Sequence, residues 1–295
     1  MVMTIIEILD RIKKGESDFH VKAQLQVLKS KEVWTPEGSL YIDLVLRDIT
    51  GSYPHFRSRI EDDIELAKVE IGNILQIQGE YKKDLDGILI TSIEKLDIFD
   101  LNNFLKLPEI DVKGLFSRIE KVIDKMENPW LKTLLEVIFD DEVVRSKFIE
   151  CPSAVKHHHA YLHGNLEHTV GMLIVFNDYY LDYYGKNRVK FDIDLVNAGI
   201  ILQDIGKIYE YMVNNGVPIY VRMYGLIGHL VLGSELVAKK ISEIPDFPED
   251  LELKIKHIIL SHHGRKEWGS PVEPSIPEAH IVHTLDLMDS RLKSF

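Results

Sequence analysis

Residues 194–211 of this chain read DLVNAGIILQDIGKIYEY. Apolar residues recur in this stretch at spacings of three and four, which predicts a buried helix. Asp204 stands inside the apolar pattern. Because an unpaired charge is unfavourable in apolar surroundings, we expect a partner or a metal ion beside Asp204. A hydrogen-bonded structural aspartate is the alternative interpretation.

Helical patterning extends from Val112 almost to the end of the chain, and further potential metal ligands stand on separate predicted helices. The sequence has 13 histidines, most of them between His157 and His283. For any one of them, a structural or surface histidine is the alternative. Several histidines and aspartates on apolar helix faces are hard to explain without a shared charge, so we expect one or two divalent ions. The candidate ligands are His168, Asp204, His229, His262, His263 and Asp286.

The composition narrows the kind of metal and the compartment. Cys151 is the only cysteine, so a cysteine-based zinc site and an internal disulfide are both excluded. A histidine and carboxylate set suits Mn, Fe, Mg, Co, Ni or Zn in an open catalytic site. The single cysteine also suits a reducing compartment. The apolar run in residues 1–17 is too short and too charged for a signal peptide or a membrane span. We therefore expect a cytoplasmic protein without a membrane partner.

The first third of the chain predicts a small β-barrel. Apolar and polar residues alternate over residues 19–28, 41–49, 74–80 and 88–93. Turns are expected at 35–39, 50–54 and 85–87, and a short helix at 60–69. A five-stranded OB-like barrel with a helix between its third and fourth strands fits this order. The expected fold is α+β and multidomain: an N-terminal helix (1–17), the barrel (18–98), a linker (99–111) and an all-α helical domain (112–295).

Barrels of this kind bind single strands by stacking bases on aromatic side chains within a basic groove. Trp34, which we place in the turn after the first strand, lies near Lys31, and we expect both to contact substrate. The charge balance opposes this role. Residues 18–100 contain 10 Lys and Arg and 16 Asp and Glu, a net charge of −6, and the whole chain carries −12. Docking or formation of a homo-oligomer is therefore an alternative role for the barrel.

The order of the candidate ligands resembles that of the HD phosphohydrolase superfamily. One branch is particularly similar, the YhaM-type 3′-to-5′ exoribonucleases, which combine an N-terminal OB fold with a C-terminal HD domain. The resemblance covers roughly residues 18–293. It rests on LRDITG (46–51), HHAYLHGNLEHT (158–169), DIGK (204–207), GLIGHLVLGSE (225–235), HIILSHHGRKEWGSP (257–271) and EAHIVHTLDLMDS (278–290).

The resemblance implies roles for these residues. A metal-activated hydroxide would attack phosphorus. Lys207 would neutralise a phosphate oxygen, with a solvated helix lysine as the alternative. His158 and His159 would contact substrate or support the ligands, with a polar loop as the alternative. The implied ligands are His168, Asp204 and Asp286 for one ion, and Asp204, His229 and His262 for a second, with His263 beside them.

The chain departs from the superfamily at the residue pair that gives the HD domain its name. Gln203 stands where the histidine of the His-Asp pair is expected. A glutamine amide oxygen is a weak, neutral ligand that does not replace imidazole for Fe, Mn or Zn. The site therefore holds one metal, or two with the first one weakened, or it is inactive. His283, one helical turn before Asp286, compensates in part or is a structural histidine.

These features support three hypotheses about function. The first is a metal-dependent phosphodiesterase, a 3′-to-5′ exonuclease acting on single-stranded RNA or DNA. The second is a phosphomonoesterase that acts on nucleotides or other small phosphate esters with the same metal chemistry. The third is a non-catalytic binding protein with a degenerate HD site, for which Gln203 is the main support.

Overall fold

The computed structural model describes residues 2–60, 63–155, 159–184 and 190–292. The chain forms two compact units. The first comprises Met1–Pro108 with Asn214–Val217, and the second comprises Glu109–Val213 with Pro218–Phe295. No helix of the described ranges is long and apolar enough to cross a membrane.

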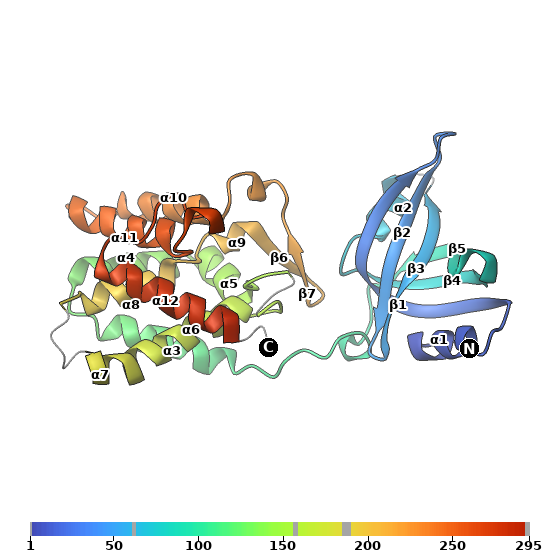
Figure 1. The fold of residues 1–295 in the computed structure, drawn as a ribbon, viewed down its shortest axis with the longest axis horizontal. Helices are drawn as coiled ribbons and strands as arrows, with labels where there is room; N and C mark the ends of the chain where they lie inside the picture. The colour runs from blue at the N-terminus through green and yellow to red at the C-terminus, as the bar shows by residue number, and fades with distance from the viewer. Residues whose placement is uncertain (1, 61–62, 156–158, 185–189, 293–295) are drawn as a thin grey trace. The chain divides into compact units, whose positions relative to one another are not determined.

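The first unit is built on a closed five-stranded barrel with the strand order β1-β2-β3-β5-β4 (Figure 1). Neighbouring strands are antiparallel except β3 and β5, which pair in parallel and close the barrel. Short helix α2 (Asp63–Lys68) lies between β3 and β4 in the chain, as expected for the OB-like order. The strands are β1 (Asp18–Trp34), β2 (Leu40–Asp48), β3 (Gly51–Ile60), β4 (Ile74–Lys82) and β5 (Gly87–Lys95).

Helix α1 (Ile5–Lys13) is part of the barrel's hydrophobic core. Ile5 and Ile8 are fully buried in the same apolar cluster as the inward-facing strand residues. A capping box between Thr4 and Glu7 starts the helix. The Asp48 carboxylate, at the end of β2, accepts a hydrogen bond from the Ile5 backbone N–H at 2.8 Å. The amphipathic pattern of the first residues thus reflects burial against the barrel.

The expected turn at residues 50–54 is wrong in its extent. Strand β3 already begins at Gly51 and includes Tyr53 and Pro54. The chain reverses more tightly, because the Asp48 carboxylate also accepts the Thr50 backbone N–H at 2.8 Å. Trp34, expected in a turn, is the last residue of β1 and pairs with Leu40.

The second unit is a helical domain (Figure 1). Barrel and helical domain together confirm the expected fold class. The expected all-helical pattern is interrupted by a two-stranded hairpin, β6 (Tyr211–Asn214) and β7 (Val217–Tyr220), whose tip residues Asn214–Val217 are assigned to the first unit. The helices are α3 (Val112–Asp124), α4 (Pro129–Asp140), α5 (Glu142–Glu150), α6 (Gly164–Ile174), the π-helical turn η3 (Val175–Tyr180), α7 (Leu181–Tyr184), α8 (Ile193–Leu202), α9 (Lys207–Glu210), α10 (His229–Ile241), α11 (Glu249–Ser261) and α12 (Pro277–Leu292).

The helix predicted across residues 194–211 ends earlier than its apolar pattern indicates. Helix α8 stops at Leu202, and residues 203–206 form a turn before α9. Asp204 therefore lies in a buried turn and not inside a helix. Gly206 makes this turn possible, because a Cβ atom here would collide with the backbone carbonyl of His229 at the start of α10. The close approach sets Asp204 beside His229.

We expect Gly206→Ala to destabilise the helical domain by about 1–3 kcal/mol, because the added methyl meets backbone atoms that cannot move independently. Urea unfolding followed by circular dichroism measures the change. Gly233→Ala is the matched control, since its Cβ would lie 3.1 Å from the Gly206 backbone nitrogen. Alanine also favours the α10 interior, so the control should lose less stability. Equal stability of both variants and the wild type would contradict the close approach.

Candidate metal centre

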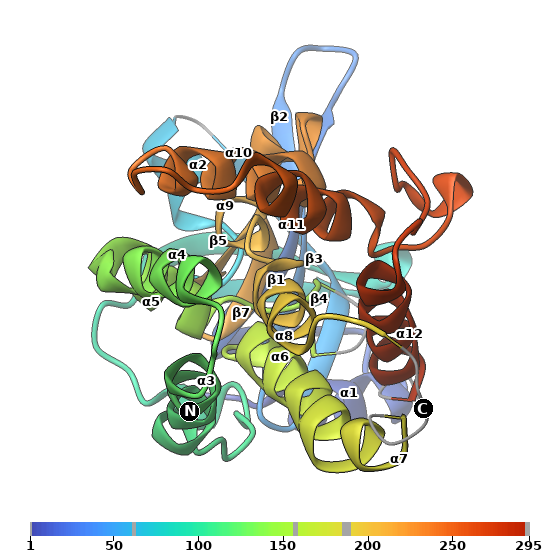
Figure 2. The same cartoon turned by 90° about the vertical axis from the view of Figure 1, so that its left-hand side faces the viewer.

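Three helices pack against one another around the residues of the candidate site. Helices α6, α8 and α12 are mutual neighbours (Figure 2). His168 lies on α6, Asp204 follows α8, and Asp286 lies on α12. Helices α10 and α11 pack together and bring His229 and His262 to the same place. Residues from five separate helical segments thus meet at one point.

Asp204 lies at the centre of this cluster and is 2% exposed. Its two carboxylate oxygens face different neighbours. Oδ2 accepts a hydrogen bond from Lys207 Nζ at 2.8 Å and lies 3.6 Å from His168 Nε2. Oδ1 lies 3.4 Å from His262 Nε2 and 3.7 Å from His229 Nε2. Burial raises the pKa of Asp204, but Lys207 and the histidines outweigh it and hold that pKa well below its usual range.

His168, Asp204 and Asp286 form a first group, whose potential ligand atoms lie within 4.8 Å of one another. His168 is fully buried, and its Nε2 lies 3.2 Å from Asp286 Oδ1. Burial lowers the pKa of His168, but hydrogen bonds to Asp286 and Asp289 outweigh it and raise that pKa to about 9. Because only an unprotonated imidazole nitrogen binds a metal, a proton and a metal ion compete for His168.

His229, His262 and His263 form a second group within the same distance limit. Each Nδ1 has an oxygen partner: Glu210 Oε2 at 2.8 Å for His229, the Ile259 carbonyl at 2.9 Å for His262, and the Trp268 carbonyl at 3.1 Å for His263. Partners at Nδ1 fix the ring and leave Nε2 for a metal. Burial and the two other histidines lower the pKa of His263 to about 3.

Buried polar atoms without a hydrogen bond show whether these residues fit a metal ion. Asp204 Oδ1 and His229 Nε2 are buried and have no hydrogen-bond partner among the described residues. Buried polar atoms without a partner are costly, and a cation between these two atoms would satisfy both. Oxygen and nitrogen donors without sulfur suit divalent Mn, Fe, Co, Ni or Zn. The residues present therefore fit a divalent metal ion.

Gln203 is fully buried beside His168. Its Nε2 lies 3.3 Å from His168 Nε2 and 3.1 Å from the sulfur of Met172. Its Oε1 is buried without a hydrogen-bond partner among the described residues. The Gln203 amide thus lies beside His168 Nε2, the atom through which His168 would bind a metal. Gln203 therefore contacts His168 of the first group directly.

A chain of hydrogen bonds fixes His168 from behind. Asp289 Oδ2 lies 2.7 Å from His168 Nδ1 and 2.9 Å from His159 Nε2. His159 Nδ1 lies 2.9 Å from the Tyr161 hydroxyl, which donates to Glu167 Oε2 at 2.6 Å. Burial raises the pKa of Asp289, but the two histidines outweigh it and keep that pKa well below its usual range. Such a carboxylate orients a ligand imidazole and increases its basicity.

The structure favours one of the two roles expected for His159, contact with substrate or support of the ligands. Its side chain is 3% exposed and contacts Tyr161 and Asp289 through its two ring nitrogens, which fits support of the ligands. It therefore lies behind the ligands and not on an accessible surface. His158, for which the same two roles were expected, lies outside the described residues.

The remaining expected residues lie in varied places. Lys207 is 7% exposed and paired with Asp204, so it is not a solvated lysine. His283 Nδ1 lies 2.7 Å from the His262 carbonyl, which is a structural role, and His283 belongs to none of the metal-binding groups found among the described residues. In the first unit, Trp34 is 63% exposed and Lys31 is exposed at the same end of β1.

Asp289, Glu210 and Tyr161 lie behind the candidate ligands and were not predicted from the sequence. Asp289 lies one turn after Asp286 on α12, so its spacing was a usable signal. Glu210 stands in the apolar stretch KIYEY and is 5% exposed, which is the same signal that identified Asp204. Nothing in the sequence marks Tyr161, because its partners come together only through the tertiary fold.

The chain is similar to known proteins that contain an HD domain. The family model of the HD domain matches residues 165–291. The 3'-5' exoribonuclease YhaM of Oceanobacillus iheyensis is 30% identical over 276 residues, which are 91% of this chain and 83% of that protein. The YhaM of Listeria monocytogenes EGD-e is 30% identical over 86% of this chain and 80% of its own length. That of Shouchella clausii is 29% identical over 85% and 77%. No solved structure matches the chain.

We expect Asp289→Asn to weaken divalent metal binding about 10- to 100-fold, because the neutral amide orients His168 without increasing its basicity. Calorimetric titration of the metal-free protein with Mn²⁺ measures the affinity. Asp250→Asn, on the exposed first turn of α11, controls for the lost charge. Thermal unfolding in EDTA shows whether the variant is less stable without metal, which separates a loss of His168 orientation from a general loss of stability. Unchanged affinity in the folded variant would exclude the role.

Proposed function

This chain belongs to the YhaM family of 3′-5′ exoribonucleases, and we propose that it removes nucleotides from the 3′ end of single-stranded RNA by metal-dependent hydrolysis. The observation that carries the proposal is the buried Asp204 carboxylate, which lies between His168 on one side and His229 and His262 on the other. Its Oδ1 accepts no hydrogen bond among the described residues. A carboxylate in that position holds a cation. We propose RNA and not DNA as the substrate, because the relatives are named exoribonucleases.

We assign the ligands in two sets that share Asp204. When bound, divalent ions supply Lewis acidity toward the phosphate and the attacking water. The second set is better suited to a metal, because Asp204 Oδ1 accepts no hydrogen bond there among the described residues, whereas Oδ2 already accepts one from the Lys207 ammonium. Gln203 weakens the first set further through its amide contact with His168. The sets are His168, Asp204 and Asp286, and Asp204, His229 and His262, with His263 beside the latter.

Other side chains of the domain orient the ligands and place a positive charge where a phosphodiester would bind. Glu210 orients the His229 ring and Asp289 orients the His168 ring. Lys207 keeps a positive charge inside the cluster, and the neighbouring Asp204 carboxylate outweighs burial and raises its pKa. A cation at this position offsets part of the charge that develops on a reacting phosphate. In the barrel, exposed Trp34 and Lys31 offer a base-stacking surface and a phosphate contact.

In the presence of Mn²⁺, we expect the protein to shorten a 5′-labelled RNA oligonucleotide progressively from its 3′ end. Asp204→Asn should reduce the rate by more than the about 10- to 100-fold typical of residues that only support ligands. Denaturing gels that resolve single nucleotides measure both rates, with Asp250→Asn as the control. A DNA oligonucleotide of the same sequence tests the sugar preference. Release of inorganic phosphate from mononucleotides without RNA shortening would favour a phosphomonoesterase instead.

We expect Gln203→His to raise the number of tightly bound Mn²⁺ ions, because an imidazole replaces the amide that faces His168 Nε2. Elemental analysis after dialysis measures the metal-to-protein ratio. Gln24→His, on the outside of the barrel, is the control for adding a histidine. An unchanged ratio would exclude Gln203 from the metal environment. If only the histidine variant shortens RNA, the natural protein is a non-catalytic member of the family.

A further inference from the structure

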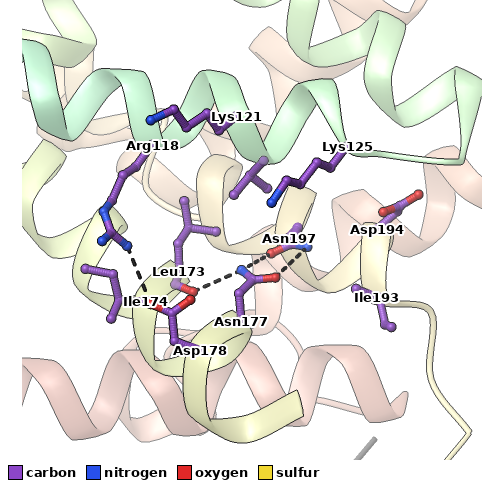
Figure 3. Close-up of a pocket in the computed structure, with 11 residues that line it drawn as sticks. Arg118, Lys121, Lys125, Leu173, Ile174, Asn177, Asp178, Ile193, Asp194 and Asn197 are labelled. Carbon is purple, nitrogen blue, oxygen red and sulfur yellow. Dashed lines mark hydrogen bonds and ion pairs between the residues drawn. The ribbon is translucent and has the colours of Figure 1, made fainter. Parts of the chain in front are cut away.

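A second candidate binding site lies in the helical domain, apart from the metal centre. It is a pocket of about 360 Å³ between α3, the end of α6 with the π-helical turn η3, and the start of α8 (Figure 3). None of the candidate metal ligands lines it. Its volume falls within the range of sites for small molecules. A π-helical turn beside a pocket is itself a feature that recurs at functional sites.

One wall of the pocket is cationic. Arg118, Lys121 and Lys125 project from α3 at spacings that put them on one face of the helix (Figure 3). Lys121 and Lys125 are exposed and have no carboxylate within 4.0 Å in the part of the chain that is described. Arg118 lies 3.5 Å from Asp178, but both side chains are 52% exposed, so this ion pair is weak. The wall thus offers positive charge to an anion.

The second acidic residue of the pocket, Asp194, is already bound by backbone N–H groups. Asp194 Oδ2 accepts hydrogen bonds from the backbone N–H groups of Glu127 and Asn128, both at 2.7 Å. Its carboxylate therefore holds the backbone just before α4. The two lysines remain as the cations without an anionic partner in the pocket.

The floor of the pocket is a pair of amide side chains. Asn177 Nδ2 donates to the Leu173 carbonyl at 2.9 Å and to Asn197 Oδ1 at 2.8 Å. Asn197 Nδ2 returns a longer hydrogen bond of 3.4 Å to Asn177 Oδ1. Asn197 is 4% exposed. Each amide oxygen can accept a second hydrogen bond and Asn197 can donate another, so the pair presents donors and acceptors together.

We propose that this pocket binds a nucleoside monophosphate, with the phosphate against Lys121 and Lys125 and the base edge against the Asn177–Asn197 pair. Val122 and Ile193 supply apolar surface for the sugar and the base. A phosphate group matches two lysines, and a base edge matches an amide pair with unused donors and acceptors. The choice of a nucleotide rests on the proposed function, because hydrolysis of RNA from its 3′ end releases such monophosphates.

A bound nucleotide would contact two of the helices that lead to the metal centre, α6 and α8. Leu173 follows His168 on α6, and Asn197 precedes Gln203 and Asp204 along α8 and the turn after it. The pocket therefore offers the product of the proposed reaction a second place on the protein, connected to the ligands through two continuous helical segments.

Isothermal titration of the full chain in EDTA tests this site, because the metal centre then holds no ion to which a phosphate could bind. We expect one nucleoside 5′-monophosphate per chain, and binding weakened about tenfold or more in Lys121→Gln/Lys125→Gln. Lys113→Gln/Lys239→Gln makes the same charge change on exposed lysines outside the pocket and should leave binding unchanged. Asn177→Ala should weaken binding of the monophosphate but not that of inorganic phosphate.

Three results would overturn the proposal: no binding to the metal-free wild type, equal binding by the Lys121→Gln/Lys125→Gln variant, or inorganic phosphate binding as tightly as the monophosphate. The RNA assay with Mn²⁺ on the same preparations tests the proposed function separately. A protein that binds nucleotide in EDTA yet leaves RNA intact contradicts only the nuclease assignment. A protein that shortens RNA but does not bind nucleotide in EDTA contradicts only the pocket.

Discussion

The burial of one carboxylate, that of Asp204, is the constraint on which the helical domain depends. A charge that is 2% exposed persists only where opposite charge or hydrogen-bond donors surround it. Lys207 supplies that charge on Oδ2, while His229 and His262 surround Oδ1. Each neighbour comes from a different segment, so their convergence fixes how α8, α9, α10 and α11 meet. The tight turn at Gly206 serves the same convergence, because it lets the backbone after Asp204 approach the start of α10.

Much of this arrangement could be predicted from the sequence, and the failures have physical reasons. Apolar periodicity identified the buried Asp204 and the separate segments that bear His168, His229 and Asp286. The same periodicity concealed the end of α8, because Ile205 and Ile208 continue the apolar pattern through a turn. Periodicity reports burial, and it is silent on whether the backbone keeps its helical hydrogen bonds.

The residues behind the ligands were harder to predict because their partners are distant in the sequence. His159 contacts Asp289 across 130 residues, so its burial depends on how α6 and α12 pack. The sequence therefore left two roles open for His159, contact with substrate or support of the ligands, and only the tertiary contacts place it behind His168. Strand β3 shows the same limit on a smaller scale, because the side chain of Asp48 allows a tighter reversal than the residues 50–54 indicate.

The first ligand group joins α6 to α12, with His168 and Asp286 118 residues apart in the chain. A ribosome releases a chain from its N-terminus, so α12 is the last helix of this domain to leave the exit tunnel. Until then His168 has neither Asp286 nor Asp289 beside it, and the carboxylates that orient it and would complete its ion site are missing. The first ligand group therefore cannot form before α12 has packed against α6, whereas the second group needs no residue of α12.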